Sequence, residues 1–473
     1  MKAMLKKFTI LFSILLLNGL AQMLMAQSHS LQLNFPTYKN DTVLLAHYYN
    51  GKLFVNDTLP LNAKGTATLN DELRPQGIYT LYFGDKKRID FLLGADQTLT
   101  VEQTDGATKI TRAPESEWFQ AYIDYLADKK KEAAELHQNL KASTENTELA
   151  ADLKQQLNNL DNDIEEKWKQ EAAKGAGTFY GKFMASNIRP KLNPNELPDS
   201  VQDNDSSAWV YTYNFNKTHY WDHFDLFDTR MWRTPTINSK LNEYFNEVLI
   251  QHPDSVLPAA IQMIETSKSN PEVFQNLTSF LLNNSIQSEY LGIENVFVAI
   301  AEKYYLGGQA FWASEKTLEN IQREVYFRKN NLVGSVAKEL FLPDEEGNYH
   351  SLHQQSTPFT LVVFWEPECG HCKKQVPQLF EEVFLKTDPS KLAVMAVYTQ
   401  DNQKEWLDFL SDHELNGWLN VWDPDRVSNF QVNYNIRTTP MIYLLDKDKK
   451  IIAKKLTVDQ VKQLLDQLIE ANQ

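Results

Sequence analysis

Short runs of alternating apolar and polar residues fill the chain from Ser28 to about Arg112, and this pattern predicts β-strands. Turn residues separate the runs, and Asn50-Gly51 has the composition of a tight hairpin turn. We therefore expect residues 28–112 to form a small antiparallel β domain, either a sandwich or a barrel. The expected strands lie within residues 41–61, 65–70, 77–84, 88–94 and 97–103.

The spacing of apolar residues changes to a helical period at Ala113. Acidic residues in the first expected turn favour this start, because the helix dipole is positive there. Helical patterning continues to about Asn331 without a fixed repeat, so residues 113–333 are expected to form an all-α domain. The periodic apolar residues are Phe119, Tyr122, Ile123 and Leu126, the acidic residues are Glu115 and Glu117, and breaks are expected at 193–200, 251–255, 269–273, 283–285 and 306–309.

Strands and helices alternate from about Gly334 to the C-terminus, which is typical of a three-layer α/β domain. Residues 359–365 are a continuous apolar run, as expected of a strand buried on both faces. The chain is therefore predicted to be multidomain, with residues 334–473 as its α/β part. Further strands are expected within 391–400 and 417–423, a hairpin within 440–456, and helices directly after the cysteines and within 402–415, 425–435 and 457–472.

An aromatic-rich segment, residues 218–235, lies inside the helical region. His219 and His223 are four residues apart and could share a helix face as metal ligands. The glutamate of an HExxH motif is missing and aromatic residues crowd the segment. A packing role is therefore favoured over a metal site, and no metal or other cofactor is expected.

The first residues have the order of a secretory signal peptide. Lysines precede an apolar run from Phe8 to about Leu20, and Ala26 lies in a small-residue exit region. We expect residues 1–26 to be removed, and the mature chain to act outside the cytoplasm, in the periplasm or cell envelope. The alternative is an uncleaved membrane anchor, because the apolar stretch through Met25 nearly reaches spanning length.

The chain has 473 residues, which is more than one hydrophobic core usually supports, so two to four domains are expected. Its composition is that of an acidic globular protein. The formal net charge is −15, and loss of Lys2, Lys6 and Lys7 with the signal segment would make it −18. Such a chain repels phosphate backbones, and no basic patch with interleaved aromatics compensates. Nucleic acid is not an expected partner.

Both cysteines of the chain lie in "FWEPECGHCKKQVP", residues 364–377. A zinc site would need four ligands, and no second cysteine pair or suitable histidine pair is present. Attachment of c-type haem would need histidine after Cys372, where Lys373 stands. A purely structural disulfide between Cys369 and Cys372 stays an alternative. It would close a very short loop, and such a loop restrains the unfolded chain little and so adds little stability.

The placement of the pair favours redox chemistry. Cys369 follows a buried strand and opens a helix, where the dipole stabilises a thiolate and lowers the thiol pKa. His371 can add positive charge and tune that thiolate further. Cys372, one helical turn on, is placed to attack a mixed disulfide and release the partner. The two cysteines are thus predicted to form a redox-active disulfide.

Residues from about 334 to 473 resemble a thioredoxin fold of the TlpA/ResA-like subgroup. The resemblance rests on "FW" ending at Trp365, "CGHC" at 369–372, Pro377, and "TTP" at 438–440 before a strand. It implies that Pro440 is cis and, with Thr439, lies opposite the cysteines beside the groove for a partner's backbone. The whole layout is similar to exported proteins typical of Bacteroidetes, and for residues 28–333 this likeness implies architecture only.

Two positions depart from the family pattern. Such proteins usually bury an acid near the second cysteine to handle its proton, but the strand position is Val363 and the helix position is Gln375. Glu366 and Glu368 are close in sequence and could substitute. The GHC core also resembles protein disulfide isomerases, which are more oxidising than thioredoxin, so the direction of electron flow stays open.

The leading hypothesis is an exported thiol–disulfide oxidoreductase that reduces or isomerises disulfides of cysteine-containing envelope proteins and draws electrons from a thiol donor. One alternative is a partner-binding envelope protein with an inert disulfide. Another is a protein that handles Cu(I) through the two thiols.

Overall fold

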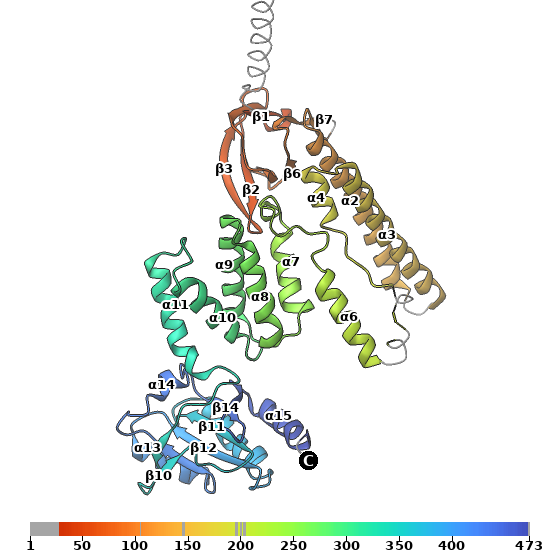
Figure 1. The fold of residues 1–473 in the computed structure, drawn as a ribbon. Coiled ribbons are helices and arrows are strands. Elements are labelled where there is room, and N and C mark those ends of the chain that lie inside the picture. The colour runs from red at the N-terminus through yellow and green to blue at the C-terminus, as the bar shows by residue number, and fades with distance from the viewer. Residues whose placement is uncertain are drawn as a thin grey trace, which may run out of the picture. The chain divides into compact units, whose positions relative to one another are not determined.

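The structure is a computed structural model that describes residues 28–104, 106–143, 147–193, 197–198, 201 and 205–471. The chain forms two compact units that meet in sequence between Val248 and Leu249 (Figure 1). The expected helical region is divided between them. Its helices up to α7 belong to the first unit and those from α8 onward to the second. The expected signal segment, residues 1–26, lies outside the described residues.

The first unit begins with a β-sandwich, as predicted. Its sheets have the strand orders β4-β1-β7-β8 and β3-β2-β5-β6, and apolar side chains from both form one buried core. All strand pairs are antiparallel except β1 with β7. Asn50 and Gly51 have φ values of 49° and 68°, as a tight hairpin between β2 and β3 requires. The strands are β1 (Ser28–Asn34), β2 (Thr42–Tyr49), β3 (Lys52–Pro60), β4 (Thr66–Glu72), β5 (Gly77–Phe83), β6 (Arg88–Leu93), β7 (Thr98–Thr104) and β8 (Ala107–Thr111), of which β1 and β8 were not singled out from sequence.

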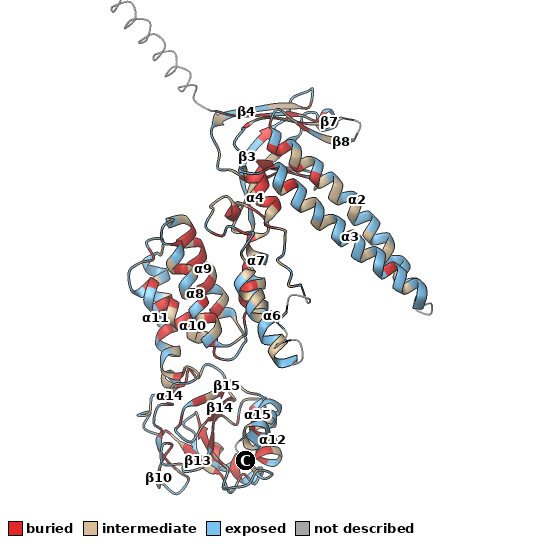
Figure 2. Ribbon diagram, turned by 45° about the vertical axis from the view of Figure 1, so that its right-hand side comes forward, coloured by how far each residue is buried: buried red, intermediate tan, exposed pale blue. Residues whose placement is uncertain are grey.

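The first unit continues with the helices α2 (Pro114–Ala142), α3 (Thr147–Lys174), α4 (Phe179–Ala185), α6 (Asp205–His219) and α7 (Ile237–Glu243). In α2 the predicted apolar face is buried at Phe119 and Tyr122, whereas most of the rest of α2 and α3 faces solvent (Figure 2). Glu115 interacts favourably with the helix dipole and also makes hydrogen bonds to two other segments. Its carboxylate accepts hydrogen bonds from the backbone N–H groups of Ala95 (3.0 Å) and Tyr180 (2.9 Å), and so joins sheet to helices.

The two histidines of the aromatic segment do not share a helix face. Helix α6 ends at His219, whose Nδ1 hydrogen-bonds to Asp222 (2.7 Å), and His223 is exposed. Neighbouring aromatic residues pack instead, with Trp221 and Tyr244 at a ring distance of 5.2 Å.

The second unit begins with α8 (Pro253–Ser267), α9 (Pro271–Gln287), α10 (Glu294–Ile300) and α11 (Glu315–Arg328). The break expected at 283–285 is wrong, because α9 runs through it to Gln287. Its polar residues bond back into the helix. The Ser285 hydroxyl donates to the Leu281 carbonyl (2.8 Å), and the Asn283 amide donates to the Ser279 carbonyl (2.8 Å).

The remainder of the second unit is the predicted α/β domain. Its main sheet has the order β13-β12-β11-β14-β15, with β11 parallel to β12 and antiparallel to β14. Every residue of β11 is buried, and apolar clusters cover both faces of the sheet. The strands are β9 (Phe341–Pro343), β10 (Tyr349–Ser351), β11 (Phe359–Trp365), β12 (Leu392–Tyr398), β13 (Leu419–Trp422), β14 (Met441–Leu445) and β15 (Ile451–Lys454), and the helices are α12 (Cys372–Leu379), α13 (Gln403–Asp412), α14 (Phe430–Asn433) and α15 (Val458–Ala471).

The helix expected within 425–435 is much shorter than predicted, since α14 begins only at Phe430. The Asp423 carboxylate accepts the backbone N–H groups of Val427 and Ser428, both at 3.0 Å, and holds them in a turn. Asn429 then has a left-handed φ of 52°, which a continuous helix does not allow.

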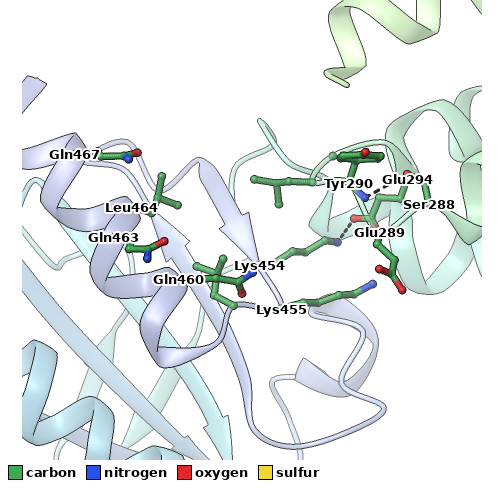
Figure 3. Close-up of a pocket in the computed structure, with 13 residues that line it drawn as sticks. Ser288, Glu289, Tyr290, Glu294, Lys454, Lys455, Gln460, Gln463, Leu464 and Gln467 are labelled. Carbon is green, nitrogen blue, oxygen red and sulfur yellow. Dashed lines mark hydrogen bonds and ion pairs between the residues drawn. The ribbon is translucent and has the colours of Figure 1, made fainter. Parts of the chain in front are cut away.

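A buried ion pair joins the helices of the second unit to its α/β domain. Lys454, at the end of β15, pairs with Glu294 of α10, and its Nζ also donates to the backbone carbonyl of Asn331 (2.6 Å). Figure 3 shows this contact among the residues that line a cleft of ≈ 570 Å³ between the 288–294 segment and α15. Burial lowers the pKa of Lys454 to about 8, although the Glu294 carboxylate opposes that shift.

Candidate active site

The cysteine motif lies where β11 gives way to α12. Trp365 is the last residue of β11, and Cys372 is the first residue of α12, with His371 at the N-cap position. Residues 366–371 make the turn between them, and the backbone N–H of Cys369 donates to the Glu366 carbonyl (3.4 Å). The predicted order of buried strand, motif and helix is therefore present.

Cys369 is the accessible thiol of the pair. It is half-buried, and its Sγ accepts a hydrogen bond from the backbone N–H of Cys372 (3.4 Å). Partial burial favours the thiol, but the hydrogen bonds from the backbone N–H and side chain of Cys372 outweigh it. The pKa of Cys369 therefore lies below its ordinary value, as expected at the start of a helix.

Cys372 has the opposite environment. Its side chain is completely buried in an apolar cluster with Val363, Trp365 and Val376. Burial raises the pKa of Cys372 to about 12, while the backbone amide of Glu366 partly offsets the shift. The two sulfurs are free thiols here. The two thiols therefore differ in both properties: Cys369 is accessible and has a lowered pKa, whereas Cys372 is buried and has a raised pKa.

The loop before β14 closes over the pair. The Thr439–Pro440 peptide bond is cis, as the resemblance implied. The Sγ of Cys369 donates a hydrogen bond to the carbonyl oxygen of Thr439 (3.2 Å), across a sequence separation of 70 residues. The structure therefore brings together Cys369, Cys372, Thr439 and Pro440.

Glu366 has a role that the sequence did not reveal. Its Oε1 accepts a hydrogen bond from the Thr439 hydroxyl (2.7 Å), and its Oε2 accepts one from the Gln400 side chain. The carboxylate therefore ties the end of β11 to the Thr439 loop rather than pointing only into solvent. The sequence offered its position after a buried strand and its closeness to the cysteines, which suggested a part in proton handling, but neither signal identified Thr439 or Gln400 as its partners.

The other predicted residues surround the pair less directly. Trp365 is fully buried and packs against Phe409 at a ring distance of 4.8 Å. His371 is exposed at the helix start, and Gln375 is half-buried in α12. Whether the Gln375 side chain takes part in proton transfer stays a prediction.

A polar cleft of ≈ 340 Å³ lies beside the Thr439 loop. It is formed at the ends of β11 and β12 and by the segment that leads into β14. Its polar walls include Glu366, Gln400, Arg426, Gln431, Arg437 and Thr439. Thr439 lines this cleft, and its carbonyl oxygen lies 3.2 Å from Cys369 Sγ, so the cleft lies close to the accessible thiol.

No cluster of three or more metal-ligating acids, histidines and cysteines occurs among the residues that the structure describes. In the same part of the chain, no helix has both the length and the apolar character of a membrane span.

Comparison with known families gives two matches. A thioredoxin-like family matches residues 359–451, and a family described as a domain of unknown function matches residues 155–334. The chain is 26% identical over 139 residues to the thiol-disulfide oxidoreductase ResA of Geobacillus thermodenitrificans, a match that covers 29% of this chain and 78% of that relative.

Solved structures give further likenesses. A domain described as a possible thiol-disulfide isomerase from Cytophaga hutchinsonii is 34% identical, with a TM-score of 0.28, and the match covers 30% of this chain and 95% of that one. A thioredoxin-like protein from Bacteroides caccae is 18% identical, with a TM-score of 0.42, and that match covers 59% of this chain and 97% of the other.

Proposed function

We propose that this chain, which belongs to the TlpA/ResA-like thiol–disulfide oxidoreductases, reduces or isomerises disulfides of envelope proteins through Cys369 and Cys372. The observation that carries the proposal is the contrast between the two thiols. Cys369 is accessible with a lowered pKa, whereas Cys372 is buried with a raised pKa. A purely structural disulfide has no need of that contrast.

The contrast defines an order of bond changes. The Cys369 thiolate attacks one sulfur of a substrate disulfide, forms a mixed disulfide, and expels the other substrate sulfur, which takes up a proton. Cys372 then loses its proton and attacks the Cys369 sulfur. That second step frees the remaining substrate thiol and leaves a Cys369–Cys372 disulfide. The substrate has gained two electrons and two protons, and a thiol donor must reduce the protein again. In reverse, the same steps use the Cys369–Cys372 disulfide to oxidise a substrate dithiol. Isomerisation follows if another thiolate of the substrate attacks the substrate sulfur of the mixed disulfide, forms a new substrate disulfide and expels the Cys369 thiolate.

The central experiment is capture of partners in cells with Cys372→Ser. Removal of the resolving thiol leaves mixed disulfides on Cys369, which can be isolated without reductant and identified. Capture of envelope proteins with cysteine pairs is expected. Failure to capture any disulfide-linked protein, with Cys369 shown to be reduced, would contradict the proposal.

Export is supported by the N-terminal sequence alone. If the signal peptide is removed, the exported protein should begin at Gln27 or a near neighbour. N-terminal analysis measures this directly. Recovery of intact Met1 in a membrane fraction would instead favour the anchored form.

The alternatives predict different chemistry at the two thiols. A partner-binding protein with an inert disulfide should not react quickly with iodoacetamide after reduction, whereas a redox site should react at Cys369 only. A copper-handling protein should bind Cu(I) stoichiometrically at the pair. The asymmetric pKa shifts favour the redox site, because a chelating pair benefits when both thiols lose their protons easily.

A further inference from the structure

Arg437, two residues before Thr439, is held by a helix outside the thioredoxin-like part of the chain. Its Nη1 and Nη2 each lie 3.1 Å from one carboxylate oxygen of Glu324, which is on α11. Its guanidinium carbon also lies 4.9 Å from the ring centroid of Phe327 on the same helix. Two parallel bonds to a planar group fix its orientation as well as its position, which a single ion pair would not do.

Glu324 is also held in place by a second arginine, Arg328, on the same helix. Glu324 is only 20% exposed, and its Oε2 also accepts from Arg328 Nη1 (3.1 Å), whose side chain is 14% exposed. Exposed ion pairs contribute little to stability because water screens them and their side chains are mobile. The Arg437 side chain is itself 45% exposed, so screening alone does not set this pair apart. Its two-point geometry and the contact with Phe327 do, because they fix the guanidinium and with it the chain segment that follows Arg437.

A second set of contacts fastens the same segment. The side-chain amide of Asn331, which is fully buried, donates to the Asn433 carbonyl (3.1 Å). Arg437 Nε donates to the Asn435 side chain (2.8 Å). Residues 433–437 are therefore tied to residues 324–331 at two points on the way to the cis-proline loop.

We propose that α11 positions the 437–440 loop against Cys369, and that Glu324 is a positioning residue for the substrate disulfide. Arg437 lines the cleft beside the loop, and the Thr439 carbonyl lies 3.2 Å from Cys369 Sγ. A shift of Arg437 would therefore move the wall of the cleft that a substrate polypeptide uses. This inference rests on the proposed disulfide exchange, and it gives the last helix of the 155–334 region a part in substrate recognition.

The test compares two disulfides on the full-length protein. One is a synthetic peptide of about ten residues closed by a single disulfide, which can fill the cleft, and the other is 2-hydroxyethyl disulfide, which cannot. Glu324→Gln keeps the shape but removes the charge, and Arg437→Lys keeps the charge but removes the planar fork. Glu319→Gln is the matched control, because Glu319 is on the same helix and, among the residues that the structure describes, forms an ion pair only with exposed Lys316.

We expect Glu324→Gln and Arg437→Lys each to raise KM for the peptide about fivefold, with kcat changed less than twofold, since displacement of a binding wall misplaces the substrate. The rate with 2-hydroxyethyl disulfide should stay the same within a factor of two. The double variant should be no worse than either single variant, because both remove the same contact. Glu319→Gln should match the unaltered protein with both probes.

An unchanged peptide KM in both variants would overturn the inference. So would an equal loss with both probes, because that result means a damaged thiol pair or fold rather than a displaced loop. If the unaltered protein exchanges neither disulfide, the proposed function fails and the inference fails with it. If the unaltered protein is active and the variants match it, only the inference fails.

Discussion

The hydroxyl of Thr439 donates a hydrogen bond of 2.7 Å to the carboxylate of Glu366, across a sequence separation of 73 residues. Thr439 presents its carbonyl to the Cys369 sulfur, and the Glu366 backbone amide lowers the pKa of Cys372. Glu366 therefore contacts both halves of the site. Its carboxylate is engaged by Thr439 and Gln400, which favours a positioning role over proton transfer to Cys372.

This relationship predicts that the acceptor oxygen of residue 366 matters more than its charge. Glu366→Ala should lower kcat/KM for a disulfide-closed peptide about five- to tenfold, because the Thr439 hydroxyl loses its hydrogen-bond acceptor. Glu366→Gln keeps an oxygen for the Thr439 hydroxyl and should lose less than twofold. Steady-state kinetics of the two variants beside Thr439→Val measure this. An equal loss in the glutamine and alanine variants would show that the charge acts instead.

The pKa contrast predicts a division of labour between the cysteines. At neutral pH Cys369 should be alkylated by iodoacetamide much faster than Cys372, since only the first has a lowered pKa and an accessible sulfur. Cys372→Ser should accumulate mixed disulfides, and Cys369→Ser should trap almost none. Mass spectrometry of the alkylated protein and non-reducing gels report the two results. Equal trapping by the two variants would refute the assignment.

Resolution of the mixed disulfide should be strongly pH-dependent. Burial raises the pKa of Cys372 to about 12, so only a small fraction is thiolate at pH 7, and that fraction grows about tenfold per unit of pH below the pKa. Stopped-flow decay of a mixed disulfide should therefore speed up from pH 7 to pH 10. A flat profile would mean that deprotonation of Cys372 does not limit the step.

Gln375→Glu provides the matched test of proton handling. Residue 375 is one helical turn past Cys372 in α12, and a carboxylate there could accept the proton that glutamine cannot. The variant should resolve mixed disulfides faster near neutral pH and add a titration to the profile. Identical rates and profiles in the two proteins would mean that position 375 has no part in proton transfer.

The Lys454–Glu294 pair predicts a pH-dependent stability effect. Glu294→Gln leaves a buried charge without its partner and should cost about 3 kcal/mol of unfolding free energy at pH 7. The folded-state pKa of Lys454 is about 8, below the value of about 10.4 in an unfolded chain. Between about pH 8 and about pH 10.4 the lysine is protonated in the unfolded chain but mostly neutral in the folded chain, so the free energy of unfolding rises with pH in this range. A neutral Lys454 does not need the Glu294 carboxylate as a partner, so the cost of Glu294→Gln becomes smaller.

Urea unfolding at pH 7 and pH 9.5 measures this effect, which should shrink at the higher pH. Lys404→Met is a suitable control, because its pair with Asp408 is exposed and should contribute little at either pH. A loss in Glu294→Gln that is equally large at both pH values would show that the lysine charge is not its cause.

The sequence alone determined the features that depend on local pattern. Period-two alternation identified most strands of the sandwich, the apolar run at 359–365 identified the central strand, and the spacing of Cys369 and Cys372 indicated redox chemistry. The strand signals succeed because strand periods and turn composition are properties of neighbouring residues. The redox role of the cysteine pair stays a prediction. The break expected at 283–285 failed where polar side chains bond back to their own helix. The helix expected within 425–435 failed where the Asp423 carboxylate holds a turn.

Only the tertiary structure decided which distant residues meet at the site. Thr439 reaches Cys369 across 70 residues, and Arg437 reaches Glu324 across 113. No local period encodes such pairs, because they depend on how the strand ends and helices pack rather than on their own composition. The same holds for the two cysteines. Their spacing is visible in sequence, but the burial that raises one pKa and the hydrogen bonds that lower the other exist only once β11, α12 and the cis-proline loop have come together.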